Sequence, residues 1–142
     1  MDQFRHFVLA QEPVYGAVEA ELAAGCKKSH WMWFVFPQFA GLGHSAMAEK
    51  YALHSLAEAE AYARHPVLGP RLRHCTGLVN HHEERSIGEI FGSPDDMKFH
   101  SSMTLFSRAA PDNADFLEAL ARFFSGRPDQ RTLMLLGGES AG

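Results

Sequence analysis

The sequence predicts an all-α protein, a single compact domain of about seven to eight short helices over residues 1–142. Two observations lead to this prediction. Apolar residues recur every three or four positions in most of the chain, and Ser, Asp, Gly and Pro residues stand where helices begin and end. The length of 142 residues fits one domain and allows a buried core without disulfides or a metal.

The first two predicted helices precede Gly25. The apolar face of the first is short and consists of Phe4, Phe7 and Val8. We expect the second helix to start at Pro13, because proline suits the first helical position, and to end at Gly25. Its apolar side chains recur at every fourth position: Val14, Val18 and Leu22.

Two further helices follow in the middle of the chain. Ser55 and Glu58 form a capping-box pattern before an Ala-rich stretch that ends at His65. Pro66 then restarts a helix. One face of this helix carries Leu68, Leu72, Cys75 and Val79.

The pattern of residues in the C-terminal third of the chain predicts three helices. Ser93 as N-cap and Pro94 as first residue start a helix that runs to Ala109. Its expected core residues are Phe99, Met103 and Phe106. Asp112 is the expected cap of the next helix, whose apolar residues are Phe116, Leu120, Phe123 and Phe124. Gly126 and Pro128 end it before a last short helix through Leu136, and Gly137 with Gly138 begins a frayed tail.

The run from Trp31 to Phe36 is apolar throughout and fits a buried strand or a buried helix. Its composition favours a strand. A lone strand among helices would lack a partner for its backbone groups, and no other segment alternates well enough to supply one. We therefore predict a helix, with Trp31 and Phe36 buried.

Composition limits the classes of function. Thirteen Lys and Arg residues against seventeen Asp and Glu give a net charge of −4, which argues against nucleic-acid or anionic-membrane binding as the main role. Cys26 and Cys75 are too few for a disulfide framework, and with no signal-peptide pattern at the N-terminus this predicts a cytoplasmic protein. Residues 29–48 lack acidic and basic side chains, yet their Pro, Gly and His residues favour a core segment over a membrane span.

Several motifs carry a family resemblance. They are KSHWMWFVFPQ with GLGHS at residues 28–45, HPVLGPRL at 65–72, IFGSPDD at 90–96 and KFHSSMTLF at 98–106. In this order they closely resemble the DUF1810 family of small bacterial proteins, from Phe7 to about Leu136. The resemblance implies an all-α fold of the Rv1873-like kind and no established activity.

The aromatic block at residues 28–45 supplies the first candidates for ligand binding. Trp31 and Trp33 beside His30 and Gln38 would make a wall for a flat ligand, although dense aromatic residues are more often core. His30 would suit a general base, and a buried hydrogen-bonded histidine is the alternative. Ser45, after a Gly-x-Gly turn at an expected helix start, would present backbone amides to an anion or simply cap the helix.

The helix from Ser93 supplies the second group of candidates. Asp95, Lys98 and Ser102 share one face, with Ser101 beside it. An ion pair between Asp95 and Lys98, and close helix packing at the serines, are the structural alternatives. Arg71 would add a fixed cation for an anionic ligand or lie on the surface.

No other chemistry is indicated by the sequence. The nine histidines form neither an i, i+4 pair on a predicted helix nor an HExxH motif, and His81-His82 beside Glu83-Glu84 would point in divergent directions. No Walker loop and no GxGxxG motif is present. We therefore expect neither metal nor cofactor, and the sequence identifies no catalytic residue.

Two hypotheses of function follow. The first is a small protein that binds or acts on a planar, anionic, nucleotide-like molecule in an aromatic and polar pocket. The second is a noncatalytic module for protein interaction or self-association. Polar side chains of the two candidate groups that converge on one cavity would favour the first, and a flat exposed aromatic patch would favour the second.

Overall fold

The computed structural model of the chain describes residues 2–137, and within this range the chain forms ten α-helices and no strand. The prediction of an all-α fold is confirmed. Seven helices have at least seven residues, and the three others are single turns of four or five. The helices are α1 (Arg5–Gln11), α2 (Tyr15–Ala24), α3 (Met32–Val35), α4 (Ala46–Lys50), α5 (Leu56–Arg64), α6 (Leu68–Asn80), α7 (Ile87–Phe91), α8 (Asp95–Ala109), α9 (Ala114–Phe124) and α10 (Gln130–Leu136).

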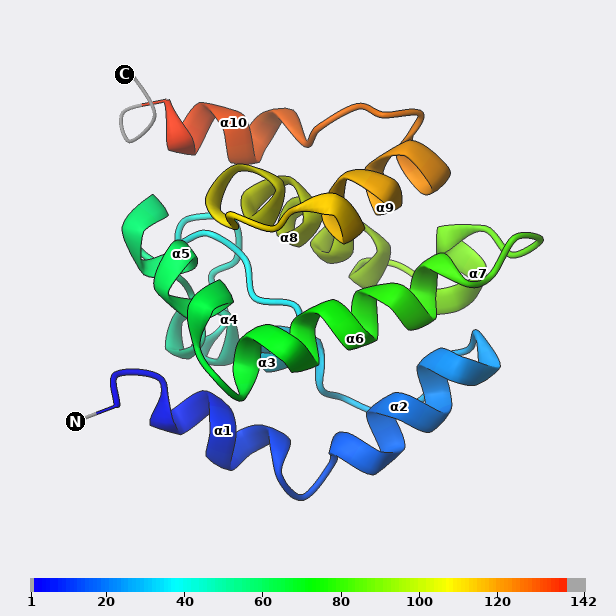
Figure 1. Cartoon of the computed structure of the whole chain (residues 1–142), viewed down its shortest axis with the longest axis horizontal. Coiled ribbons are helices and arrows are strands. Elements are labelled where there is room, and N and C mark those ends of the chain that lie inside the picture. The colour runs from blue at the N-terminus through cyan, green and yellow to red at the C-terminus, as the bar shows by residue number, and fades with distance from the viewer. Residues whose placement is uncertain (1, 138–142) are drawn as a thin grey trace.

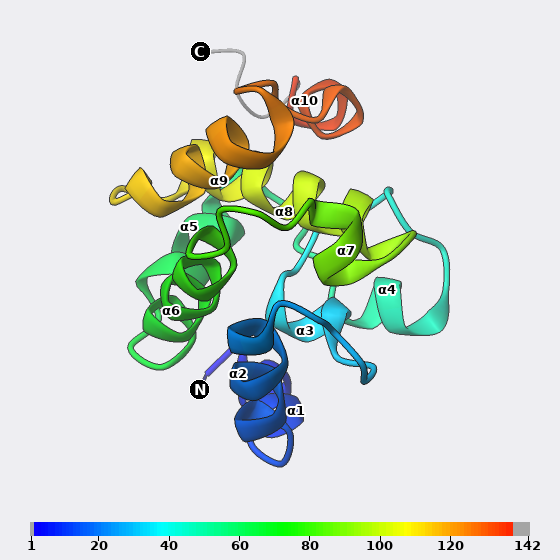
Figure 2. The ribbon, with the colours of Figure 1, turned by 90° about the vertical axis from the view of Figure 1, so that its right-hand side faces the viewer.

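Helix α8 lies at the centre of the fold. It packs against α5, α7, α9 and α10. Helices α1 and α2 lie at one end of the molecule and α10 at the other, in the first view (Figure 1) and after a 90° turn (Figure 2). In the aromatic block between α2 and α4, helix α3 packs against α1, and the Phe36 ring contacts Phe91 of α7 and Phe99 of α8.

The expected apolar faces of α6 and α8 are buried as predicted. Their buried residues include Leu68, Leu72, Cys75, Val79, Phe99, Met103 and Phe106. Gly69 lets α6 approach α5 closely, because a Cβ at this position would clash with the Ala63 carbonyl oxygen. Burial raises the pKa of the Cys75 thiol to about 12, so this cysteine stays protonated at neutral pH.

The segment Trp31–Phe36 is helical for one turn only, as α3. Trp31 and Phe36 flank this turn and are fully buried, as predicted. The chain beyond Phe36 meets the segment before α5, where the Leu53 amide donates to the Gln38 carbonyl at 3.0 Å and the Ala40 amide to the Leu53 carbonyl at 2.8 Å. This isolated bridge satisfies backbone groups without forming a strand.

Serine and aspartate side chains cap the N-termini of several helices, but not always at the positions that the sequence predicted. Ser55 accepts from the Glu58 amide, but the Glu58 carboxylate accepts from the His54 amide, so the expected capping box is displaced by one residue. A complete capping box joins Ser86 and Glu89 at the start of α7, a helix that our sequence reading missed.

Three predicted helix starts are wrong by one or two residues. Helix α2 begins at Tyr15 and not at Pro13, because a turn closed by the Val14 amide and the Gln11 carbonyl precedes it. It ends as expected at Gly25, whose φ of 73° is left-handed.

At α8 the N-cap is Pro94, not Ser93. The Gly92 and Pro94 carbonyls and the Asp96 carboxylate accept the first-turn amides, which leaves no cap role for the Ser93 hydroxyl.

At α9 the N-cap is Asn113, not Asp112. Asp112 instead accepts, through its carbonyl, from the guanidinium of Arg73.

Two further expectations concern membranes and the chain end. Across residues 2–137, no helix has the length and apolar character needed to cross a membrane. The frayed tail expected from Gly137 and Gly138 lies, except for Gly137, outside the described residues.

Candidate functional site

A cavity of about 240 Å³ opens where the loop between α3 and α4 meets α8 and α10. Leu42, Ala48, Pro94 and Met97 supply its apolar lining. The polar side chains in the lining are those of Gln38, His44, Ser45, Lys98, Ser101, Asp129 and Arg131. We call this hollow the α8–α10 cavity.

The α8–α10 cavity brings together four residues from the two candidate groups. Gln38 and Ser45 come from the aromatic block and the turn after it, and Lys98 and Ser101 from α8. Lys98 and Ser101 are three positions apart, so they lie on one face of the helix. The bridge at Leu53 fixes the backbone of Gln38 beside this face.

Lys98 is the cationic side chain of α8 in the lining. Its ammonium lies 3.4 Å from the Asp95 carboxylate and 5.2 Å from the centre of the Trp33 ring. The same carboxylate binds the Lys27 ammonium more closely, at 2.8 Å. One negative charge is therefore shared by two positive ones, and a net positive charge remains beside the cavity.

Arg131 is a cation that our sequence reading missed. It lies in the first turn of α10, and its guanidinium donates to the Leu42 carbonyl at 3.4 Å. Among residues 2–137 no carboxylate forms an ion pair with it. A cation in the first turn of a helix is repelled by the positive end of the helix dipole. The unusual position of Arg131 could therefore have identified it from the sequence.

The negative charge in the lining belongs to Asp129 and already has partners. Its Oδ2 atom accepts from the Thr132 hydroxyl at 2.6 Å and from the Thr132 amide at 3.1 Å. The Ser101 hydroxyl lies 3.1 Å from this atom and 3.1 Å from the Met97 carbonyl, so its one hydrogen is shared between the two acceptors. This carboxylate caps α10 and ties it to α8. Asp129 stays negatively charged, and the two cations Lys98 and Arg131 together outweigh its charge in the lining.

Other lining groups keep donors for a ligand. The Ser45 hydroxyl oxygen accepts from the Ala48 amide, which leaves its hydrogen to donate. The side-chain amide of Gln38 forms no hydrogen bond within the described part of the chain. With Lys98 and Arg131, the cavity offers more donors than acceptors, which is the chemistry of an anion site.

The remaining candidates do not line this cavity. Trp31 is fully buried, and its indole N–H donates to Glu21 at 3.0 Å. Trp33 packs under Lys98, and Asp95 holds Lys98 and Lys27. Neither indole is part of the lining of the α8–α10 cavity.

Arg71, His30 and Ser102 also lie elsewhere. Arg71 donates to Gln11 and Glu12 and covers the Tyr15 ring. His30 is exposed, so the alternative of a buried hydrogen-bonded histidine is wrong. Ser102 is fully buried in the core, where its hydroxyl has no hydrogen-bond partner within residues 2–137.

Glu21 explains the position of Trp31, and our sequence reading overlooked it. Besides the indole, its carboxylate accepts from the amides of Lys28 and Ser29 and from the Ser29 hydroxyl. Partial burial would raise the pKa of Glu21, but the hydrogen bonds outweigh it and hold the pKa at about 2. The charged carboxylate thus fastens the start of the aromatic block to α2.

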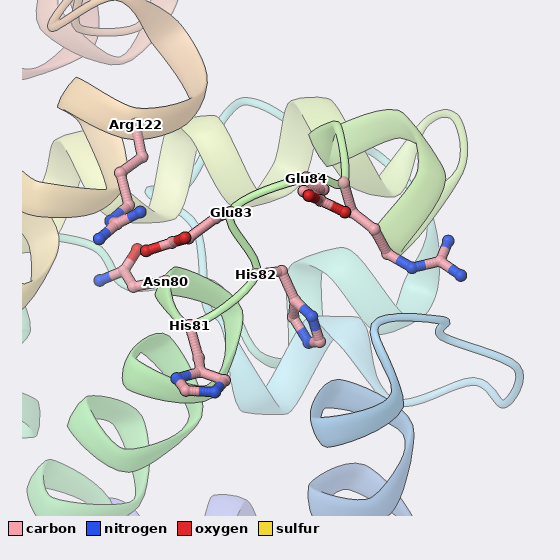
Figure 3. A pocket seen from close by; sticks show the side chains of 7 residues that line it. Asn80, His81, His82, Glu83, Glu84 and Arg122 are labelled. Atoms are coloured by element: carbon pink, nitrogen blue, oxygen red, sulfur yellow. The ribbon is translucent and has the colours of Figure 1, made fainter.

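A larger and more open hollow of about 560 Å³ lies at the C-terminal end of α6, beside α9 (Figure 3). Asn80, Glu83 and Arg122 point toward one another there, while His81 and His82 extend to different sides of the loop. Arg122 is already paired with Glu118 at 2.6 Å. In the part of the chain that the structure describes, no group of three His, Cys, Asp or Glu side chains is placed to hold a metal.

The comparison with protein families identifies the chain. The family described as "Protein of unknown function (DUF1810)" matches residues 1–136. The chain belongs to the DUF1810 family. The resemblance noted in the motifs is therefore confirmed, and the match includes every residue of the α8–α10 cavity.

The DUF1810 chain is also similar to a solved structure, that of the conserved hypothetical protein Rv1873 from Mycobacterium tuberculosis. The two chains are 57% identical, the TM-score is 0.91, and the match covers 93% of this chain and 94% of that chain. No curated protein matches. Because these descriptions name no activity, the function of this DUF1810 chain has to be argued from its own side chains.

Proposed function

We propose that the α8–α10 cavity binds a small anionic metabolite. The observation that supports this most is the shared lining of Lys98 from α8 and Arg131 from α10. The Arg131 guanidinium has no ion pair within residues 2–137, and Lys98 shares its carboxylate with Lys27. A ligand carboxylate or phosphate would supply the negative charge that both cations lack.

The charges around the cavity agree with this proposal. Lys27, Lys98 and Arg131 are positive, and Asp95 and Asp129 are negative, so the cluster is positive while the whole chain carries −4. A local positive field on an acidic protein attracts anions to this place and not to the surface at large. The volume of about 240 Å³ suits a metabolite smaller than most drug-sized ligands.

Whether the ligand is planar, as a nucleotide is, depends on the aromatic side chains of the cavity and not on its charges. A planar, nucleotide-like ligand would stack on an aromatic wall, and the aromatic side chain in the lining is the His44 imidazole. The proposal therefore rests on cations and hydrogen-bond donors, and nucleotides are one class of anion to be tested among others.

A thermal-shift screen followed by titration calorimetry tests the proposal. We expect phosphates or carboxylates to stabilise the protein, by about 2.7 kcal/mol at a ligand concentration of a hundred times Kd. Lys98→Met and Gln38→Leu should each weaken binding by tenfold or more with unchanged circular dichroism. The matched control is Lys28→Met, since Lys28 is exposed and outside the lining. Equal affinity in all four proteins would overturn the proposal.

The second candidate function is self-association or binding of a protein partner. It is favoured by Met134 and Leu135, which are 80% and 40% exposed on α10. Analytical ultracentrifugation over a range of concentrations tests it. A dimer that dissociates in Met134→Ser, together with a failed ligand screen, would replace the first proposal by this one.

A further inference from the structure

A second hollow of about 200 Å³ lies along α10 and shares two of its lining residues with the α8–α10 cavity. It is lined by Gly41, Leu42, Arg131, Met134 and Leu135. Leu42 and Arg131 line both spaces, so the two are neighbours that meet at the Arg131 side chain. We call the second space the Leu42–Met134 groove.

The groove is apolar except at the end where it meets the cavity. Arg131, Met134 and Leu135 follow i, i+3, i+4 spacing, so they share one face of α10. Opposite them, the loop before α4 contributes Leu42 and Gly41. A Cβ placed on Gly41 would lie 3.5 Å from the methyl carbons of Leu135, which shows how closely the loop and the helix approach.

The position of Arg131 gives the groove a polarity. Its guanidinium donates to the Leu42 carbonyl, where the two spaces meet. On one side of it lie the donors Lys98, Ser45 and Gln38, and on the other side lie thioether and branched aliphatic side chains. A ligand that filled both spaces would be negatively charged at one end and apolar at the other.

Resting on the proposed function, we infer that the ligand is an amphipathic anion: a carboxylate or phosphate monoester whose charged group binds between Lys98 and Arg131 and whose short alkyl or acyl chain lies in the Leu42–Met134 groove. Methionine suits this role because its unbranched, polarisable side chain adapts to chains of different length.

A protein partner fits the groove less well than an alkyl chain. Specific protein interfaces bury on the order of 800 Å² per partner. The exposed apolar residues here are two neighbours on one short helix, Met134 and Leu135, and a cation stands at the end of their groove. The small apolar area and the cation at its end match one chain with one terminal charge.

Two homologous series of probes test the inference by titration calorimetry or NMR titration of the full chain. The first runs from acetate through hexanoate to octanoate, and the second compares inorganic phosphate with butyl and hexyl phosphate. Full burial of one methylene strengthens binding about fourfold, so in a half-open groove we expect about two- to fourfold per added methylene. The series with the tighter shortest member identifies the charged group.

Variants separate the two parts of the ligand. Met134→Ser and Leu135→Ser should flatten the dependence on chain length and leave acetate and phosphate affinity unchanged. Lys98→Met should weaken every member of the series by a similar factor. Leu117→Ser is the matched control, because Leu117 is 50% exposed on α9, outside both spaces.

The outcomes distinguish this inference from the proposed function. Anions that bind with no dependence on chain length, or a dependence that persists in Met134→Ser and Leu135→Ser, would overturn the inference and leave the anion site standing. Failure of every anion to bind would overturn both. A change in the sedimentation of the purified protein on mutation of Met134, without any effect of chain length, would assign the groove to a second copy of this chain and overturn the inference.

Discussion

The Lys27 ammonium lies 2.8 Å from the Asp95 carboxylate and so joins the segment after α2 to the first turn of α8. The Lys27 side chain is only 7% exposed. It also donates to the Ser29 carbonyl at 2.7 Å and lies 5.0 Å from the centre of the Trp31 ring. Because Asp95 also holds Lys98, this ion pair connects the aromatic block to the cation of the α8–α10 cavity.

Removal of Asp95 alone should therefore destabilise the protein strongly. Asp95→Ala leaves the Lys27 charge nearly buried without a counter-ion, and we expect a loss of about 3 kcal/mol in the free energy of unfolding. The double variant Lys27→Met/Asp95→Ala should lose less than Asp95→Ala alone. Urea denaturation of the four proteins of this cycle measures the coupling, and additive losses would show that the ion pair does not act as a unit.

The carboxylate of Glu21 should make stability depend on acid. Its folded pKa of about 2 lies below the ordinary 4.5, so its contribution is complete above about pH 4.5 and is lost as the pH falls toward 2. Glu21→Gln removes the charge and should lower the free energy of unfolding near pH 7 by about 1 to 3 kcal/mol. The gap between the two proteins should narrow from pH 4.5 downward. A difference in the free energy of unfolding that stays constant down to pH 2.5 would contradict the low pKa of Glu21.

Trp31 and Phe36 should contribute to stability through packing. Both side chains are fully buried at the two ends of α3, and Phe36 also packs edge-on against Phe99 of α8 at 5.1 Å. Substitution of either by Ala should cost about 3 to 5 kcal/mol, because transfer energy is lost and a cavity remains. Thermal unfolding followed by circular dichroism measures this, with His30→Ala as a control at an exposed neighbour. Unchanged midpoints would show that the block is not core.

The sequence predicted the long helices well, because their periodicity records which face is buried. Leu68, Leu72, Cys75 and Val79 recur at helical spacing, and all four pack inside. Helix starts were less predictable, since several acceptors compete for the same amides. Ser93 is a good cap by type, yet the carbonyl of Gly92 and the carboxylate of Asp96 are better placed.

The candidate site was predictable only in part, for a related reason. Gln38, Ser45, Lys98 and Ser101 were predicted as binding candidates from their local sequence, and all four line the α8–α10 cavity. Arg131 was missed although a cation in the first turn of a helix is unusual, because the sequence does not show that its guanidinium meets the loop at Leu42. Trp31 was included on its chemistry alone, although the Glu21 carboxylate that fixes it stands ten positions earlier on another helix.

The adjacent serines of α8 provide the last prediction, because they have the same type and opposite surroundings. The Ser101 hydroxyl lies 3.1 Å from the carboxylate of Asp129 and 3.1 Å from the Met97 carbonyl, whereas the buried Ser102 hydroxyl has no hydrogen-bond partner among residues 2–137. Ala is the better helix former at both positions by a few tenths of a kcal/mol. Ser101→Ala should still cost about 1 to 2 kcal/mol, since it removes a hydrogen bond to a charged group.

Ser102→Ala should be neutral or stabilise by up to about 1 kcal/mol, because no hydrogen bond is lost and a polar atom leaves the core. Chemical denaturation of both variants checks the difference, and a Ser102→Ala protein as destabilised as Ser101→Ala would mean that Ser102 has a partner in solution.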